Sequence, residues 1–318
     1  MIELLRYTSD YKSQWDHLIS CSRNGTFLFY RDYLEYHSDR FNDHSFIFFK
    51  KGRIEAVIPG NVTNATFISH EGLTYGGLIS SANIVTTDVL EIFKLFNSEL
   101  EKIGIKEVIY KLIPSIYHFL PCQEDIFALA LNRAIKMECN ISTTIFMNNK
   151  LPFRELRKRG AKKSLRNGVN VIESDNYSGF WEILENNLII KYNVKPTHSI
   201  EEIKYLKNRF PDNIKLYLAQ KSDQILAGVL LFITRNVIHC QYISANEEGK
   251  RLCSLDLIFD ELINKQIAST YIFDFGISTE NMGNFLNTDL IFHKEGFGGR
   301  AIVYEIYKYE IEQTLVPL

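Results

Sequence analysis

Apolar residues recur at two different spacings along the chain, and these spacings predict alternating helices and strands. Short apolar runs that end at Gly, Asn, Asp or Ser are typical of strands, whereas apolar residues three and four apart are typical of helices. The helical spacing occurs over 11–22, 27–42, 86–103, 177–192, 199–209 and 254–267. The strand pattern occurs within 46–62, 106–113, 142–147, 216–234, 237–245, 271–276 and 301–311.

The second half of the chain combines these elements in a recognisable order. Two helices precede a strand hairpin over 216–234, with Ser222-Asp223-Gln224 near its turn. A strand, a helix and a further strand follow, and a short helix then leads to the final strand. Hairpins together with a strand–helix–strand crossover predict an α/β fold with a mixed, largely antiparallel sheet flanked by helices.

A basic stretch separates the two halves. Seven of the thirteen residues from Arg154 to Arg166 are Lys or Arg, and strand–helix successions lie on either side. A length of 318 residues allows two domains of ordinary size. We therefore predict a first domain over residues 1–150 and a second over 151–318.

The composition limits the classes of protein to which the chain can belong. The chain is 46% apolar and 23% charged, with a formal net charge of −2, so no global field points to DNA or to an anionic membrane. The N-terminus lacks a signal-peptide pattern, and no stretch of about 18 apolar residues predicts a membrane span. Five scattered cysteines without a CxxC pair fit reduced thiols, and no metal-ligand spacing occurs. These features predict a cytoplasmic protein without a metal.

The turn after the strand 237–245 is a candidate anion-binding site. It reads Asn246-Glu247-Glu248-Gly249-Lys250-Arg251 and precedes a predicted helix. Backbone amides at such a position favour an anion, and a glycine allows close approach of a phosphate. Asn246, Gly249, Lys250 and Arg251 are therefore expected to bind a phosphate group. The alternative is an ordinary surface loop with a helix cap at Ser254.

Catalytic candidates lie at the end of the strand 271–276. Glu280 and Asp274 are carboxylates near the carboxyl end of this strand, where either could remove a proton from an attacking amine or hydroxyl. Tyr242 and His239 on the neighbouring strand are the alternatives. Ser278 and Thr279 fit a helix cap, and Glu280 fits its first turn equally well.

Two further segments carry candidate substrate-binding residues. Arg154, Lys158 and Lys162 recur every four residues along one side of the basic helix, where they could bind phosphates of the acceptor. His70 and Tyr75 are polar groups in a Gly-rich loop. The alternative for the basic helix is a face exposed only to solvent, and the alternative for the Gly-rich loop is a purely structural role.

Three segments together resemble one family. FRELRKRGAKKSLRNGVNV (153–171) resembles the basic stretch between the two GNAT domains of FemAB/FemX proteins. SHEGLTYGGLI (69–79) resembles their first-domain loop, and FDFGISTENMGNFLNTDLIFHKEGFGG (273–299) resembles their C-terminal segment with its K-x-x-FGG element. The match covers nearly the whole chain in order.

The resemblance implies two tandem GNAT-type domains and an acyltransferase of bacterial surface-polysaccharide biosynthesis. It implies an acyl-CoA donor, whose diphosphate would be bound by Asn246, Gly249, Lys250 and Arg251. It also implies a nucleotide- or lipid-linked sugar as the acceptor and functional roles for Lys294 and Phe297. Some family members take their acyl group from aminoacyl-tRNA, which is the alternative donor. No long heptad insertion lies between residues 168 and 215, and this argues against the tRNA branch. A binding module with a degenerate GNAT site is the non-enzymatic alternative.

Overall fold

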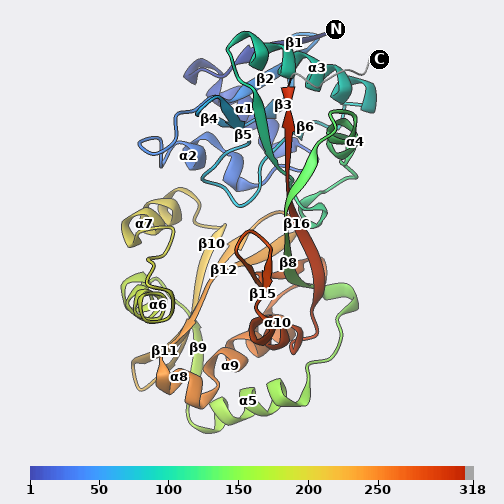
Figure 1. Ribbon diagram of the computed structural model, residues 1–318. Coiled ribbons are helices and arrows are strands. Elements are labelled where there is room, and N and C mark those ends of the chain that lie inside the picture. The colour runs from blue at the N-terminus through green and yellow to red at the C-terminus, as the bar shows by residue number, and fades with distance from the viewer. Residues whose placement is uncertain (312–318) are drawn as a thin grey trace. The chain divides into compact units, whose positions relative to one another are not determined.

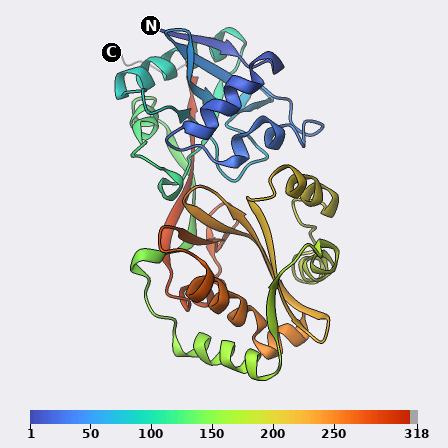
Figure 2. The same ribbon diagram turned by 180° about the vertical axis from the view of Figure 1, so that it is seen from behind.

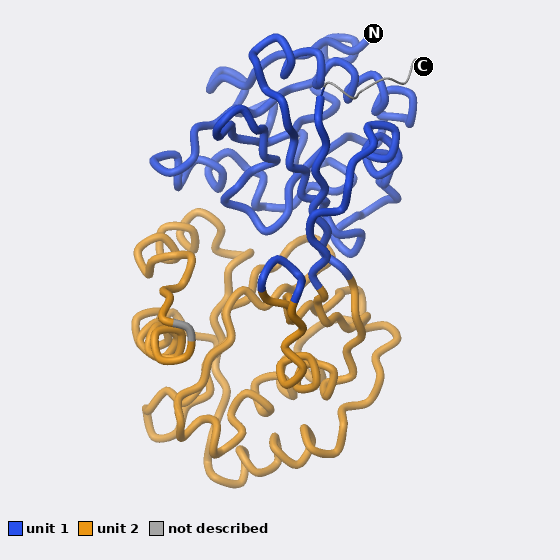
Figure 3. The backbone as a smooth tube through the Cα atoms, viewed as in Figure 1, with its two compact units in different colours: residues 1–140, 281–284, 303–318 blue, residues 141–280, 285–302 orange. Residues whose placement is uncertain are grey.

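The computed structural model describes residues 1–311, apart from the side chain of residue 192, and these residues form two compact units (Figure 3). Unit 1 contains residues 1–140, 281–284 and the C-terminal segment from Val303, whereas unit 2 contains residues 141–280 and 285–302. The division thus differs from the predicted one, which was continuous and lay at residue 150. The reason is strand β16 (Arg300–Glu310), which returns to unit 1 and pairs antiparallel with β7 (Glu107–Lys111).

Unit 1 contains two groups of paired strands and four α-helices. One group has the order β1-β2-β3-β6, and the other has the order β4-β5-β7-β16. Its core is rich in phenylalanine, and five of these rings are at most 2% exposed: Phe46, Phe48, Phe67, Phe93 and Phe96. The bounds are β1 Ile2–Arg6, β2 Phe46–Lys50, β3 Arg53–Ile58, β4 Asn61–Thr63, β5 Thr66–Ile68, β6 Ile79–Ser80, α1 Lys12–Cys21, α2 Arg31–Leu34, α3 Thr86–Lys102 and α4 Glu124–Leu131.

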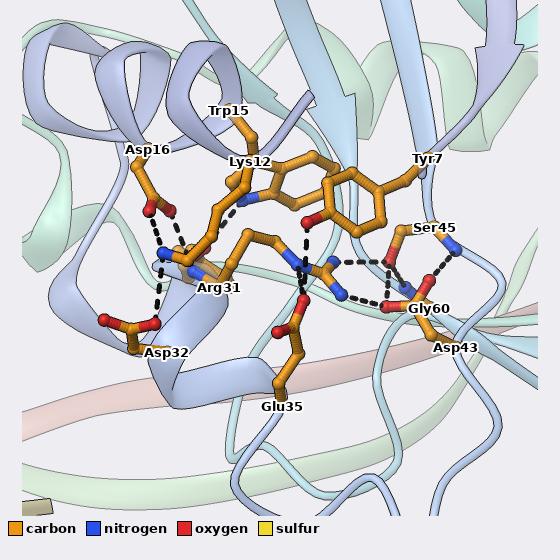
Figure 4. Close-up of polar contacts among 11 residues, drawn as sticks. Tyr7, Lys12, Trp15, Asp16, Arg31, Asp32, Glu35, Asp43, Ser45 and Gly60 are labelled. Carbon is orange, nitrogen blue, oxygen red and sulfur yellow. Dashed lines mark hydrogen bonds and ion pairs between the residues drawn. The ribbon is translucent and has the colours of Figure 1, made fainter. Parts of the chain in front are cut away.

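A buried arginine anchors helix α2 in unit 1 (Figure 4). Arg31 is 1% exposed, and its guanidinium carbon lies 3.7 Å from the centroid of the Tyr7 ring. Its Nη2 lies 2.6 Å from Asp43 Oδ2, its Nε lies 2.9 Å from Glu35 Oε1, and its Nη1 donates to Ser45 Oγ at 3.4 Å. Because the guanidinium joins α2 to residues just before β2, this cluster fixes the entry into the first sheet.

The sheet of unit 2 has the strand order β8-β13-β12-β11-β10-β9. The β10–β11–β12 pairs are antiparallel, β12 pairs with β13 in parallel, and β13 pairs with β8 antiparallel. Ser222 and Asp223 form the β10–β11 turn with φ of 46° and 67°, which confirms the predicted hairpin. The bounds are β8 Ile135–Phe146, β9 Asn170–Glu173, β10 Ile214–Lys221, β11 Gln224–Ile233, β12 Val237–Ala245, β13 Ile272–Ile277, β14 Thr279–Glu280 and β15 Phe285–Leu286.

Helices cover both faces of this sheet (Figures 1 and 2). Helices α6 and α7 pack on one face of β10–β12, and α8 and α9 pack on the other face. Helix α5 lies against α9 rather than against the sheet. The bounds are α5 Glu155–Arg166, α6 Tyr177–Tyr192, α7 Ile200–Arg209, α8 Glu247–Leu252, α9 Ser254–Glu261 and α10 Thr288–Glu295.

Two predicted helices end differently from the sequence pattern. The expected helix over 27–42 is wrong in extent, because only Phe27–Phe29 and Arg31–Leu34 are helical. Phe27, Leu28 and Phe29 are all buried, so packing on every side replaces the one-sided pattern of a surface helix. The helix expected over 254–267 is α-helical to Glu261 and continues as a π-helix over Leu262–Gln266.

Candidate functional site

Strands β12 and β13 part within unit 2, and the candidate site lies where they do. Their parallel pairing runs from Val237↔Ile272 to His239↔Asp274, although β12 continues to Ala245. On its other side, β12 shifts register against β11 between Leu230 and Leu231, which leaves Gln241 as an extra residue. Such a bulge bends a strand and increases its twist. Beyond His239, the described part of β12 therefore has backbone that no β13 residue pairs.

A buried carboxylate and a histidine meet at the last pair of this ladder. Asp274 is 0% exposed, and its Oδ2 lies 2.7 Å from His239 Nδ1. Asp274 Oδ1 accepts from the Ser142 hydroxyl of β8 and from the Gly276 backbone N–H at 3.2 Å. Hydrogen bonds to a carboxylate favour its charged form, whereas burial opposes it. Asp274 can accept a proton carried on Nδ1 of a neutral imidazole, and that tautomer leaves the lone pair on Nε2.

The Nε2 edge of His239 remains accessible. The side chain is 15% exposed, and Nε2 has no hydrogen-bond partner among residues 1–311. Gly276 lies beside the ring with φ +77°, and a Cβ there would come within 3.4 Å of His239 Cε1. An imidazole held at Nδ1 by a carboxylate and open at Nε2 can accept a proton from a nucleophile.

Lys294 closes the same cluster from helix α10. It is 4% exposed, and its ammonium group donates to the carbonyl oxygens of Gly276 and Ile277 at 2.8 and 2.7 Å. Burial lowers the pKa of Lys294 to about 8, while the nearby charge of Asp274 opposes that shift. Lys294 therefore fixes the irregular end of β13, where the register against β8 shifts, and its burial leaves little surface for a substrate.

The other two catalytic candidates have partners of their own. Glu280 lies in β14, and its Oε1 accepts from Asn287 Nδ2 at 2.9 Å. The Tyr242 hydroxyl lies 2.7 Å from His198 Nδ1, and its ring packs edge-on against Trp181 of α6. Burial is the largest cause that raises the pKa of Tyr242. The structure thus joins Asp274 to His239, which the sequence suggested only as an alternative, and does not join either to Tyr242 or Glu280.

The predicted donor turn forms a short helix. Asn246 caps α8, because its Oδ1 accepts from the Gly249 backbone N–H at 2.8 Å. A Cβ at Gly249 would lie 2.1 Å from the Leu226 carbonyl oxygen, which explains the glycine by close backbone contact. Lys250 and Arg251 form ion pairs with Glu247 and Glu248 one turn away, at 2.6 and 2.5 Å. The Gly249 amide and both cations of the turn therefore have partners within α8 itself.

The basic stretch is a helix, as its spacing predicted, and a salt bridge holds it to α9. Arg157 Nη1 lies 2.7 Å from Asp256 Oδ1, and both side chains are largely buried. A Cβ at Gly160 would lie 1.9 Å from Asp256 Oδ2, so only glycine permits this approach. Arg154 stacks over Phe292, with its Cζ 4.4 Å from the ring centroid, and lies 3.6 Å from a Glu295 oxygen.

Of these basic residues, Lys158 and Lys162 line a separate cavity between α5 and α9. This cavity measures about 400 Å³, and the Lys158 ammonium lies 2.7 Å from Glu155 Oε1. It also contains Leu165 and Lys265. The two lysines are thus accessible, but they lie on the side of α5 that faces away from Gly249.

Besides Lys294, three further predicted substrate-binding residues are buried. His70 is 3% exposed, stacks on His37 with centroids 5.1 Å apart, and has a pKa lowered to about 3, chiefly by burial. Tyr75 is 3% exposed and donates to Thr26 Oγ1 at 3.2 Å. Phe297 is 0% exposed and stacks on Phe275. Their surroundings are those of core residues, so we leave them out of the candidate site.

The described residues contain neither a candidate metal site nor a membrane-spanning helix. No group of three or more His, Cys, Asp or Glu side chains in this range is placed to hold a metal ion. Within the same range, every helix is too short or too polar to cross a bilayer.

No family profile and no curated protein matches this sequence, but solved structures match its fold. A crystal structure of FemX has a TM-score of 0.67 at 10% identity, covering 98% of this chain and 98% of that chain. The C-terminal domain of a putative lysylphosphatidylglycerol synthetase from Agrobacterium fabrum has a TM-score of 0.59 at 12% identity, covering 94% and 92%. A tandem GNAT protein from the clavulanic acid biosynthesis pathway has a TM-score of 0.50 at 10% identity, covering 98% and 99%.

These likenesses confirm the predicted fold class. The chain is built from two GNAT-type domains, each with a mixed sheet flanked by helices, and its architecture is that of FemX. At identities of 10–12% the likeness concerns the fold, and the chemistry has to be argued from the chain's own residues.

Proposed function

We propose that the protein is an acyltransferase that moves an acyl group from coenzyme A to an amine or hydroxyl of a surface-polysaccharide precursor sugar. The observation that carries the proposal is the His239–Asp274 pair at the point where β12 and β13 separate. The GNAT-type fold supports a carbonyl donor lying between these strands. The resemblance to FemAB/FemX-like proteins of surface-polysaccharide gene clusters supports a sugar precursor as the acceptor.

In the proposed reaction the acceptor attacks the thioester carbonyl carbon directly. His239 Nε2 takes the proton from the attacking nitrogen or oxygen, and Asp274 stabilises the imidazolium that forms. Backbone N–H groups of β12 beyond the last ladder pair are available to stabilise the oxyanion. The tetrahedral intermediate then expels the thiolate of coenzyme A, and the proton on His239 passes to that thiolate.

Aminoacyl-tRNA is the second candidate donor, and one observation favours it. The turn expected to hold the diphosphate of coenzyme A uses its Gly249 amide for the Asn246 cap and pairs its two cations with glutamates. A donor that approaches by another set of phosphate contacts would not need this turn.

The donor is identified with a surrogate acceptor. Purified protein is incubated with hydroxylamine and either acetyl-CoA, longer acyl-CoA esters or charged tRNA, and the acyl hydroxamate is quantified. We expect hydroxamate formation above the uncatalysed rate with an acyl-CoA. Hydroxamate formation only with charged tRNA would show that the donor is aminoacyl-tRNA and not acyl-CoA. Hydroxamate formation with none of these donors would reject acyl transfer.

A further inference from the structure

Helix α5 forms one wall of a second cavity in unit 2, and this cavity is basic. It measures about 610 Å³ and reaches from the end of β12 to α10. Its lining includes Arg157, Arg159, Lys163, Lys250 and His293, with Asp256 as the carboxylate. The residues of α5 that line it differ from those that line the smaller cavity on the opposite side of the helix.

Two of the cations in this cavity are not neutralised. Arg157 is paired with Asp256, and Lys250 is paired with Glu247. Arg159 has no ion-pair partner among residues 1–311, and Lys163 donates only to the carbonyl oxygen of Arg251, at 2.6 Å. Both are exposed and lie four residues apart, so their side chains project from neighbouring turns of α5. An anion placed there would meet two uncompensated positive charges.

The position of the cavity relates it to the acyl-transfer site. Ala245, at the end of β12, lines the cavity and lies six residues beyond His239. At about 3.3 Å per residue this separation is roughly 20 Å along the strand. A long donor that follows β12 with its carbonyl group at His239 would carry its phosphates to this end.

We propose that Arg159 and Lys163 bind phosphate groups of the acyl donor, so that α5 serves the donor and not the acceptor. Side chains of α5 then take the role that the sequence suggested for the turn at Gly249. The ligand class is a diphosphate or a cluster of phosphate esters, and its identity as the donor rests on the proposed function. Charge-assisted hydrogen bonds to phosphate are the strong ones, and Arg can make two of them at once.

The test measures binding, so that it is independent of transfer. The variant Arg159→Gln/Lys163→Gln is titrated by calorimetry with coenzyme A and with a short RNA hairpin that ends in an unpaired CCA. The control Lys162→Gln/Arg166→Gln removes one Lys and one Arg at the same spacing on α5, outside the 610 Å³ cavity. His239→Asn is titrated as well, because it should bind the donor normally while losing transfer.

We expect the Kd of whichever phosphate ligand binds the wild type to rise roughly 10- to 100-fold in Arg159→Gln/Lys163→Gln. The control variant should change this Kd by less than about threefold, because salt screens the effect of removing two charges that do not contact the ligand. Weaker binding of coenzyme A by Arg159→Gln/Lys163→Gln identifies the ligand as a nucleotide diphosphate. Weaker binding of the hairpin identifies the ligand as RNA phosphates. Equal weakening by the control pair, an unchanged Kd, or no binding of either ligand to the wild type would overturn the proposal.

Discussion

Replacing His239 by asparagine should lower kcat for acyl transfer by about 10²- to 10⁴-fold, the scale of losing a general base. Asparagine can still donate a hydrogen bond to the buried Asp274, so the fold of the strand pair should survive. It offers no basic nitrogen at the Nε2 position, so the acceptor must lose its proton to water. The measurement is steady-state hydroxamate formation with the donor identified above.

The affinity of His239→Asn for the donor should stay close to that of the wild type. The imidazole is 15% exposed and acts on the attacking nucleophile, whereas the phosphates of the donor lie near α5 in our proposal. A fall in kcat with unchanged donor Kd indicates an interaction made in the transition state. A matching fall in donor affinity would mean that His239 holds the donor instead.

Glu280→Gln is the matched comparison, because the sequence alone makes Glu280 the first choice for the base. In the structure Glu280 accepts a hydrogen bond from Asn287, whereas His239 and Asp274 pair with each other. The variant should therefore keep kcat within about threefold of the wild type. If kcat fell 10²-fold or more in Glu280→Gln but not in His239→Asn, the base would be Glu280, as the sequence suggested.

Arg31→Met should destabilise unit 1 by about 3 kcal/mol. Removing one partner from a buried ion pair costs roughly 3–5 kcal/mol, because it leaves the other charge without compensation. The lower end applies here, since Asp43 and Glu35 remain 33% and 44% exposed and can be hydrated. The measurement is urea unfolding of the full chain, followed by circular dichroism.

Two further variants give this stability prediction its controls. Arg31→Lys keeps the charge but loses the planar stacking on Tyr7 and the multiple donors, so its loss should be intermediate. Arg53→Met changes an exposed arginine of β3 and should stay within about 0.5 kcal/mol of the wild type. A loss below about 1 kcal/mol in Arg31→Met would show that the cluster contributes little to stability.

Much of the fold follows from local patterns that the sequence carries. Helix α3 spans Thr86–Lys102 and was expected over 86–103, because its apolar residues recur on one face and Gly104 ends it. Strand β8 was recognised only over its last residues. Its first half, from Ile135, is mostly exposed on both faces, so no alternation marks it as a strand.

The site was harder to predict because it depends on which strands become neighbours. His239 and Asp274 each stand as a polar residue inside an apolar strand, 35 positions apart. Only the parallel pairing of β12 with β13 places them together, and Ser142 joins from a third strand. For Gly249 and Asn246, a helix cap and a phosphate turn share the same residue types, so the pattern could not distinguish them.

The tautomer of His239 tests the central claim most directly, because a base must have a free lone pair where the acceptor arrives. Long-range ¹H–¹⁵N spectra of protein labelled at histidine, assigned with His239→Asn, report which ring nitrogen carries the proton. We predict a proton on Nδ1, donated to an ionised Asp274, and an unprotonated Nε2 in the neutral ring. A neutral ring with the proton on Nε2 would contradict the account, because His239 could not then accept a proton from the acceptor.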